Sequence, residues 1–374
     1  MRALILSRNT GGGHNSASAA IAQAAEAQGW QVDIRDFMTF SDGWFSHRVG
    51  GMYVWIVKHM PFVFGAMYKL GGVISSPRRK SPIYYANRRP ARGLESYLSE
   101  ERCDVIFVPH LFPAEALTYL RTEGRLEQPV IAVATDYTCV PFWEETDCDL
   151  YAIPHEALAA EFVRHGVLSE KLAVTGIPLR KEFTALPDKH SARERLGLPK
   201  DGVIHLVMSG SMGFGRVEYM AAKLRKSIRP GDSMVIICGS DKRLRRSLEK
   251  RFSKDKNVFI EGYTDKVAAY LAACDVVYTK PGGLSSTEAA AARTALVHTS
   301  PIPGCETVNA AFFSALGMSA APRGVRRQLQ AGLELAQSAE KRHAMISAQE
   351  KNIAPDSASK VVRLALRFER AEKA

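Results

Sequence analysis

One pattern constrains the fold of this chain most: an apolar strand, a glycine-rich loop and a helix, present twice. The first copy has the strand Arg2–Ser7 and the loop Arg8–Asn15, and the second has the strand Val203–Ser209 and the loop Gly210–Gly215. Apolar strands that alternate with helices are typical of parallel sheets covered on both faces. We therefore expect an α/β protein with two Rossmann-like, doubly wound domains that face a central cleft.

Further apolar runs complete the two expected sheets. They lie at Gln31–Asp36, Val105–Val108, Val130–Thr135, Leu150–Ile153, Leu172–Thr175, Met234–Cys238, Val258–Glu261, Asp275–Thr279 and Ala295–Thr299. A polar stretch separates the two series, so we expect an N-terminal domain over residues 1–183, a linker with a short helix over 184–202 and a C-terminal domain over 203–352. The last helical stretch, 353–374, carries apolar residues at helical spacing and should pack back on a domain. With 374 residues, the chain can bury two cores.

The cysteines and the absence of long apolar runs indicate a cytoplasmic protein. The first residues enter a strand without a signal peptide's apolar run, and no uninterrupted apolar stretch reaches transmembrane length. The six cysteines show no CxxC and no paired spacing, which argues against a zinc or redox-dithiol site. We expect reduced thiols, no bound metal and no cofactor.

Positive charge is concentrated in one region of this chain, whose net charge is +11. Six basic and no acidic residues lie over 78–92, directly after an aromatic segment over 44–74 that also lacks acids. A solvated loop is the ordinary explanation of a charge run, but aromatic and basic residues together suit the headgroups of an anionic membrane. No nucleic-acid-binding motif accompanies the charge, so nucleic acid is not an expected partner. The residues expected at the membrane are Trp44, Trp55, Arg78, Arg79 and Lys80.

Two more strand–loop–helix units follow one another over residues 279–309, TKPGGLSSTEAAAARTALVHTSPIPGCETVN. The first loop opens a helix that should carry Glu288 in its first turn, and the second opens a helix with Glu306 and Asn309. Free N–H groups at a helix start favour anionic oxygens. Nearby carboxylates and amides suit the hydroxyls of a ribose or sugar, so the pair indicates the donor half of a nucleotide-sugar site. A capping box from Ser285 to Glu288 is the structural alternative.

The N-terminal loop GGGH places His14 between a strand and a helix. Its glycines let the backbone approach a substrate, but it lacks the G-x-G-x-x-G spacing of a dinucleotide site. An imidazole can take a proton near neutral pH, although a lone histidine near a helix start is often only a cap or a surface residue. Asp136, in TDY after an apolar strand, could cap the next segment, orient an imidazole or act as a base. Arg180, in TGIPLR, could bind a phosphate or belong to a turn.

Taken in order, these segments resemble the family of monogalactosyldiacylglycerol synthases and processive diacylglycerol glucosyltransferases, a family related to the GlcNAc transferase that makes lipid II. The segments are GGGH, TDY, TGIPLR, MSGSMGFG, KPGGLSSTEA and PIPGCETVNAAFF. The resemblance covers nearly the whole chain. It implies a GT-B fold, a UDP-sugar donor in the C-terminal domain, a lipid acceptor entering from the N-terminal domain, and inversion at the anomeric carbon without an essential metal.

The chain departs from the family pattern at two positions. Val140 stands where the family usually has a histidine, which bears on how the acceptor is handled. Cys305 stands where the family usually has a glutamine before the sugar-facing glutamate, which bears on the identity of the donor sugar. A thiol replaces the amide's donor and acceptor poorly.

On this interpretation the protein is an inverting hexosyltransferase that moves glucose or galactose from a UDP-sugar to a lipid, expected to be diacylglycerol, at the inner face of the cell membrane. His14 is the expected base, with Asp136 as a supporting or alternative base, and Gly12 and Gly13 belong to the acceptor loop. Two rivals share the sequence features. One is a nucleotide-sugar sensor without catalysis, and the other is a UDP-sugar 2-epimerase, which would need no lipid.

The C-terminal domain is expected to hold the donor. Glycine-rich helix starts are expected at the diphosphate, with the residues Gly210, Ser211, Met212, Gly213, Gly282, Gly283, Leu284 and Ser285. Glu288 is expected at the ribose, and Glu306 and Asn309 at the sugar. Tyr263, just after a strand, is the candidate for the uracil pocket, with core packing as its alternative.

Overall fold

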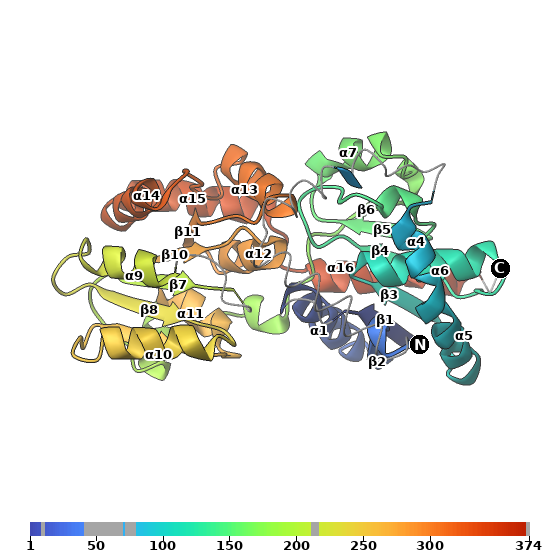
Figure 1. Ribbon diagram of the computed structural model, residues 1–374, viewed down its shortest axis with the longest axis horizontal. Helices are drawn as coiled ribbons and strands as arrows, with labels where there is room; N and C mark the ends of the chain where they lie inside the picture. Colours follow the sequence, from blue (N-terminus) through green and yellow to red (C-terminus); the bar gives the residue numbers. More distant parts are fainter. Residues whose placement is uncertain (9–11, 41–69, 72–79, 211–216, 372–374) are drawn as a thin grey trace. The chain divides into compact units, whose positions relative to one another are not determined.

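The computed structural model describes residues 1–8, 12–40, 70–71, 80–210 and 217–371. The described residues form two compact units, each with one β-sheet that has helices on both faces (Figure 1). All strand pairs in both sheets are parallel. The expected α/β class with two doubly wound parallel sheets is confirmed.

The two units do not follow the chain in a simple order. The first consists of residues 1–181, 302–305 and 356–374, and the second of residues 182–301 and 306–355. The chain thus begins in the first unit, continues through the second, and returns to the first for its C-terminal helices.

The first unit has a six-stranded sheet in the order β2-β1-β3-β4-β5-β6. Its strands are β1 Arg2–Ser7, β2 Gln31–Asp36, β3 Val105–Val108, β4 Val130–Val133, β5 Leu150–Ile153 and β6 Leu172–Val174. Strands β3, β4 and β5 are buried at every position and are apolar throughout, as strands covered on both faces must be. Strand β2 forms an edge, and its residues are half-buried or exposed.

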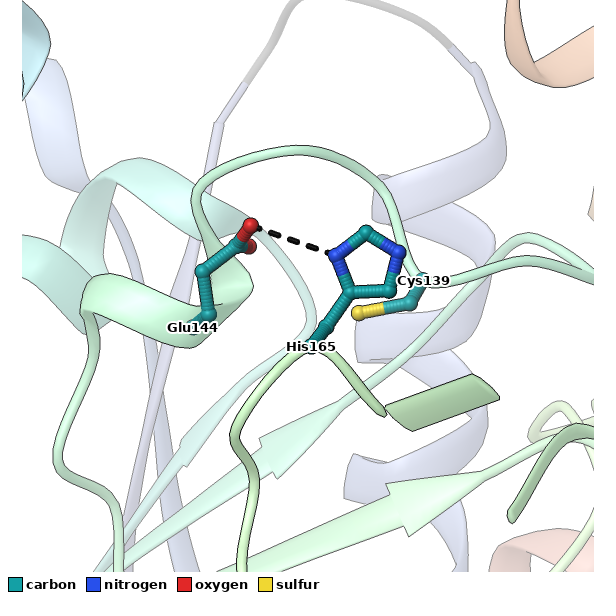
Figure 2. A group of neighbouring side chains, drawn as sticks. All are labelled: Cys139, Glu144 and His165. Carbon is teal, nitrogen blue, oxygen red and sulfur yellow. Dashed lines mark hydrogen bonds and ion pairs between the residues drawn. The ribbon is translucent and has the colours of Figure 1, made fainter. Parts of the chain in front are cut away.

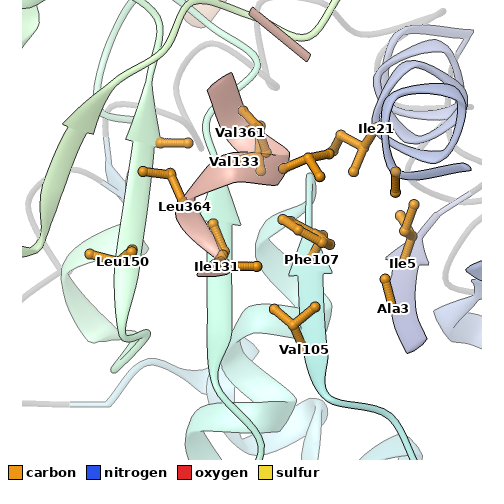
Figure 3. Close-up of a cluster of buried hydrophobic side chains, with 14 of the residues drawn as sticks. Ala3, Ile5, Ile21, Val105, Phe107, Ile131, Val133, Leu150, Val361 and Leu364 are labelled. Carbon is orange, nitrogen blue, oxygen red and sulfur yellow. The ribbon is translucent and has the colours of Figure 1, made fainter. Parts of the chain in front are cut away.

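The helices of the first unit pack on both faces of this sheet. They are α1 Gly12–Glu26, α4 Pro82–Ala86, α5 Arg88–Glu100, α6 Leu111–Thr122, α7 Ala159–Arg164, α16 Ser357–Leu364 and α17 Leu366–Ala371. Short 3-10 helices are η1 Phe37–Phe40, η2 Trp143–Glu145, η3 Glu156–Leu158 and η4 Ser169–Lys171, and η5 Lys181–Phe183 crosses into the second unit. Figure 3 shows Val361 and Leu364 of α16 in one buried cluster with Ile21 of α1 and Phe107 of β3. The C-terminal stretch of the chain is therefore part of the core of the first unit.

The second unit has a five-stranded sheet in the order β11-β10-β7-β8-β9. Its strands are β7 Ile204–Met208, β8 Ser233–Ile237, β9 Val258–Glu261, β10 Val276–Thr279 and β11 Ala295–His298. Its helices are α8 Lys189–Arg195, α9 Val217–Arg225, α10 Lys242–Arg251, α11 Val267–Ala273, α12 Gly283–Ala291, α13 Cys305–Ala315, α14 Val325–Gln337 and α15 Ala339–Asn352, of which α13 starts on a residue of the first unit.

The segment 184–202, expected to be a linker, is instead packed into the second unit. Its helix α8 lies against α11. The side chain of Arg193 is 6% exposed; its guanidinium donates to the carbonyl oxygen of Ala273 at 3.0 Å and pairs with Asp275 at 2.8 Å. The Arg193–Asp275 ion pair therefore fastens this helix to the second unit, although most of the other polar residues of the segment are exposed.

Candidate active site

The strand order of the first unit predicts where a ligand can bind. From β1 the chain crosses to β2 on one side, and β3 then lies on the other side of β1. At such a topological switch point the loops that follow the two strands separate, and the space between them is where open α/β sheets bind ligands. His14 follows β1 and His110 follows β3, and their rings lie 4.6 Å apart, edge to face.

His14 is oriented by the backbone of the β3 loop. Its Nδ1 lies 2.8 Å from the carbonyl oxygen of Pro109 and 3.3 Å from Oγ1 of Thr135. A carbonyl oxygen can only accept a hydrogen bond, so Nδ1 carries the hydrogen. In the neutral ring Nε2 is then the unprotonated nitrogen, which is the form that a general base requires.

The charges around His14 act in opposite directions. Burial lowers the pKa of His14, the charge of Asp136 and the bond to Pro109 raise it, and the charge of Arg8 lowers it again, with a net shift below the ordinary value. The imidazole is therefore neutral at neutral pH. The carboxylate of Asp136 is half-buried and close enough to stabilise the ring once it takes a proton.

Two residues of this cluster were not among the predicted site residues. Arg8 is 3% exposed, and its guanidinium lies 4.4 Å from the centre of the Phe112 ring. His110 caps α6, since its Nδ1 accepts from the N–H of Phe112 at 3.1 Å. Burial and the charges of His14 and Arg8 hold the pKa of His110 well below its ordinary value. Arg8 directly follows the strand β1, and His110 follows β3 after Pro109, which is the signal that could have identified them.

The acceptor loop is more helical than expected. Helix α1 starts at Gly12, so Gly12, Gly13 and His14 lie in its first turn, whereas the sequence predicted a loop up to Asn15. The glycines here do not break the helix, and the first turn holds His14 against the β3 loop.

The second unit has its switch point between β7 and β10. Gly210 follows β7 with φ +72°, a conformation that favours glycine, and a Cβ at this position would lie 3.1 Å from Cε of Lys280. Lys280 follows β10, and its Nζ lies 3.0 Å from Oε1 of Glu306. Lys280 was not predicted, although its place directly after an apolar strand marks it.

Helix α12 begins without a side-chain cap. Its N-cap is Gly282, which has no side chain to bond the first N–H groups. The alternative interpretation of Ser285 and Glu288 as a capping box is therefore wrong, because Ser285 lies inside the helix. Glu288 lies in the second turn, not the first, and is 8% exposed. Gly283 and Leu284 are buried in the first turn of the helix.

Asn309 joins the two donor loops. Its side chain is 0% exposed, and Nδ2 donates to the carbonyl oxygen of Pro281 at 3.0 Å. The amide thus holds the start of α12 against α13. Asn309 was expected to bind the sugar, but its side chain is fully buried. Beside these loops, His298 at the end of β11 lines a pocket of about 210 Å³ together with Ser300, Arg323 and Gln328.

Tyr263 does not join this cluster. It follows β9, an edge strand that β8 and β7 separate from β10, and it is 81% exposed. Its expected place in a uracil pocket stays a prediction. The alternative of core packing is wrong.

The predicted membrane residues are described only in part. Outside the described residues lie Trp44, Trp55, Arg78 and Arg79, as well as Ser211, Met212 and Gly213 of the donor loop. Lys80 is described and half-buried: its Nζ donates to the carbonyl oxygen of Glu145 and lies 4.9 Å from the centre of the Tyr84 ring. Lys80 is thus engaged inside the first unit, contrary to its expected place at a membrane. Across the described part of the chain, no helix combines the length and the apolar character needed to cross a membrane.

Comparison with known proteins identifies one family. Residues 14–179 match the model of the monogalactosyldiacylglycerol (MGDG) synthase family. A processive diacylglycerol beta-glucosyltransferase of Staphylococcus saprophyticus is 30% identical over 267 residues, which are 70% of this chain and 66% of that protein. The enzyme of the same name from Bacillus cytotoxicus is 25% identical over 327 residues, covering 84% of this chain and 80% of that protein. In the first three relatives, the match spans 66%, 62% and 56% of their own length.

Solved structures give the fold. MurG of Acinetobacter baumannii superimposes with a TM-score of 0.64 at 16% identity, over 98% of this chain and 99% of that one. The MnaA–UDP structure of S. aureus has a TM-score of 0.66 at 13% identity, over 99% and 97%. The predicted GT-B fold is confirmed, and the resemblance to the diacylglycerol glycosyltransferases is confirmed by the family model and the relatives.

Proposed function

We propose that this chain, which belongs to the family of monogalactosyldiacylglycerol synthases and processive diacylglycerol glucosyltransferases, transfers a hexose from a UDP-sugar to diacylglycerol. The relatives support this reaction because they are named for it. The observation that carries the proposal in this chain is His14, whose Nδ1 is occupied by the carbonyl of Pro109 so that Nε2 is left as the basic nitrogen.

The chemistry follows from that tautomer. The acceptor hydroxyl gives its proton to Nε2 of His14 as its oxygen attacks the anomeric carbon of the sugar. The bond from that carbon to the diphosphate breaks, and its electron pair leaves with UDP. Attack opposite the leaving group inverts the anomeric carbon. Asp136 stabilises the imidazolium that forms, as its effect on the pKa of His14 indicates.

The donor would be held at the switch point of the second unit. The start of α12 offers N–H groups to the diphosphate, and Gly210 brings the backbone after β7 close to Lys280. Glu288 would bind the ribose and Glu306 the sugar. Asn309 would hold the two loops together through its hydrogen bond to Pro281. Because helix N–H groups supply the positive charge, we propose that transfer needs no added magnesium or manganese.

Cys305 bears on which sugar is accepted. It is half-buried at the first position of α13, directly before Glu306. A thiol is only a weak hydrogen-bond donor and a weak acceptor, so it replaces an amide poorly. Glucose and galactose donors are therefore both candidates, and the two must be compared directly.

We further propose that transfer takes place at the inner surface of the cell membrane. The aromatic segment 44–74 and the basic run 78–92 support attachment to anionic headgroups. Diacylglycerol itself resides in a bilayer, so an enzyme that uses it must work at that surface.

One experiment tests the proposal against its rivals. The purified protein is given UDP-glucose or UDP-galactose, with and without vesicles that contain diacylglycerol, and UDP release is followed. Release that requires diacylglycerol, with a glycolipid of inverted anomeric configuration, supports the proposal. Conversion of a UDP-sugar without lipid would instead indicate an epimerase, and UDP-sugar binding without turnover would indicate a sensor.

A further inference from the structure

Three side chains that are distant in the sequence meet in the first unit. Cys139, Glu144 and His165 each offer one ligand atom, and these atoms all lie within 4.8 Å of one another. Figure 2 shows a ring nitrogen of His165 facing the carboxylate of Glu144, with the thiol of Cys139 beside the ring. The spacing along the chain gave no sign of this group, since the fold alone brings its members together.

Helix α7 positions two of the three members. The carboxylate oxygen Oε1 of Glu161 accepts from Oγ1 of Thr138 at 2.6 Å and from the N–H of Cys139 at 2.9 Å, which ties the loop after β4 to the helix. His165 is the C-cap of the same helix, and its N–H bonds to the carbonyl oxygen of Glu161. Glu161 thus fixes the backbone of both Cys139 and His165.

Glu144 comes from η2 and is turned inward. Phe142, the N-cap residue of η2, has φ +81°, a conformation that non-glycine residues rarely adopt. The side chain of Glu144 is 2% exposed, and its Oε1 lies 3.3 Å from Nδ1 of His165. Its other oxygen, Oε2, is buried with no hydrogen-bond partner among the described residues. A buried carboxylate oxygen without a partner is costly, so this oxygen points to a missing cation.

We propose that Cys139, Glu144 and His165 bind a divalent transition-metal ion of the zinc class. Three atoms within 4.8 Å of one another share a point at most about 2.8 Å from each of them (4.8 Å divided by √3), and zinc bonds to sulfur, nitrogen and oxygen are about 2.0–2.3 Å long. Each of the three ligand atoms therefore needs to move toward the ion by less than about 1 Å to complete the site. A thiolate with an imidazole selects zinc over magnesium or calcium, which prefer oxygen ligands alone.

The site has a route for the ion and an open coordination position. The side chain of His165 is 35% exposed, whereas Glu144 and Cys139 are buried. Binding releases the thiol proton to solvent and leaves water as the fourth ligand. The ion would fasten the loop after β4, which carries Asp136 three residues before Cys139. Its role is to position this loop, so the proposal is independent of the proposed transfer.

The test measures zinc on the full-length protein and does not use activity. Metal-depleted protein is titrated with zinc by calorimetry, and with cobalt by absorption, where a thiolate ligand gives a charge-transfer band. Wild type should bind one ion per chain with that band. Cys139→Ala should lose the band and weaken zinc binding at least tenfold, and Glu144→Gln should keep the band but bind zinc more weakly.

The matched control is Cys148→Ala, because Cys148 is another buried cysteine of the same unit and lies outside the group. This variant should bind both ions like wild type, and zinc should raise its thermal unfolding temperature but not that of Cys139→Ala. Circular dichroism without metal establishes that each variant is folded. Equal zinc affinity of wild type and Cys139→Ala, or no binding by folded wild type, would overturn the proposal.

Discussion

His14 can accept a proton only while its imidazole is neutral, and its surroundings favour that state. The pKa of His14 is lowered by burial more than the charge of Asp136 raises it. Turnover should therefore fall on the acidic side only as the pH drops through this lowered pKa. His14→Ala should reduce turnover by about a hundredfold or more, the usual size of a general-base effect, and the profile should lose this acidic limb.

Two further measurements test whether His14 acts as the base. UDP-sugar affinity of His14→Ala should remain near that of wild type, because the donor residues belong to the other unit. His155→Ala is the control, since His155 caps η3 and lies outside the cluster. If Asp136→Asn abolishes turnover while His14→Ala keeps most of it together with its acidic limb, the two residues exchange roles.

Glu288 and Glu306 should affect different parts of the donor. Glu288→Ala should weaken the binding of UDP itself, because ribose contacts do not depend on the sugar. Glu306→Ala should leave UDP binding intact and weaken only the UDP-sugar, because its carboxylate is expected at the sugar hydroxyls. Calorimetry with UDP and with each UDP-sugar separates the two effects. Wild-type affinities in both variants would mean that the donor binds elsewhere.

At the level of elements, helices α5 and α6 are joined by a buried carboxyl group. Glu115 of α6 is 0% exposed and accepts a hydrogen bond from Nδ2 of Asn87, the N-cap residue of α5. Burial, opposed by this bond, raises the pKa of Glu115 to about 8. The group is therefore protonated in the folded protein at neutral pH and ionised in the unfolded chain.

This shift predicts how stability depends on pH. Because the pKa of Glu115 is higher in the folded than in the unfolded state, its protonated form adds to the free energy of unfolding. This addition is complete below about pH 4.5 and is lost as the pH rises to about 8, at about 1.4 kcal/mol per pH unit. Glu115→Gln keeps the shape of the side chain and removes its titration. The free energy of unfolding of the variant, relative to wild type, should therefore rise between pH 5 and pH 8. A difference that does not change over this range would contradict the prediction.

The strands could be predicted from the sequence because their signal is local. Each of the eleven strands of the structure lies within an apolar run identified in the sequence or matches it to within a residue. Helix starts were less predictable: α1 includes Gly12 and Gly13, and α12 starts at Gly283, so Ser285 lies inside the helix and not at its cap. A glycine permits both a loop and a helix, so the packing of the whole unit decides between them.

At the level of the whole molecule, the sequence identified candidate residues but not which of them meet. His14 and Asp136 were found because each follows an apolar strand, yet Arg8, His110 and Lys280 satisfy the same rule and were missed. Neighbours in the sheet are set by strand order, which is non-local. The same holds for α16, which closes the core of the first unit from the far end of the chain.

Attachment to an anionic membrane is a property of the whole chain, which carries a net charge of +11. Because Lys80 is bonded to Glu145 inside the first unit, the prediction rests on Arg78 and Arg79. Each basic residue near an anionic surface contributes about 1 kcal/mol. Replacing both by Ser should weaken binding to anionic vesicles roughly thirtyfold at low salt, since about 1.4 kcal/mol is a factor of ten.

The matched control removes two positive charges from the other unit, as Lys254→Ser with Lys256→Ser, both exposed residues. This variant has the same net charge as the first but should bind vesicles nearly as wild type does. Co-sedimentation with anionic and neutral vesicles, at low and high salt, measures the difference. If both variants lose binding equally, net charge alone accounts for attachment. Equal binding of wild type to neutral and anionic vesicles would leave the aromatic segment 44–74 as the sole basis for attachment.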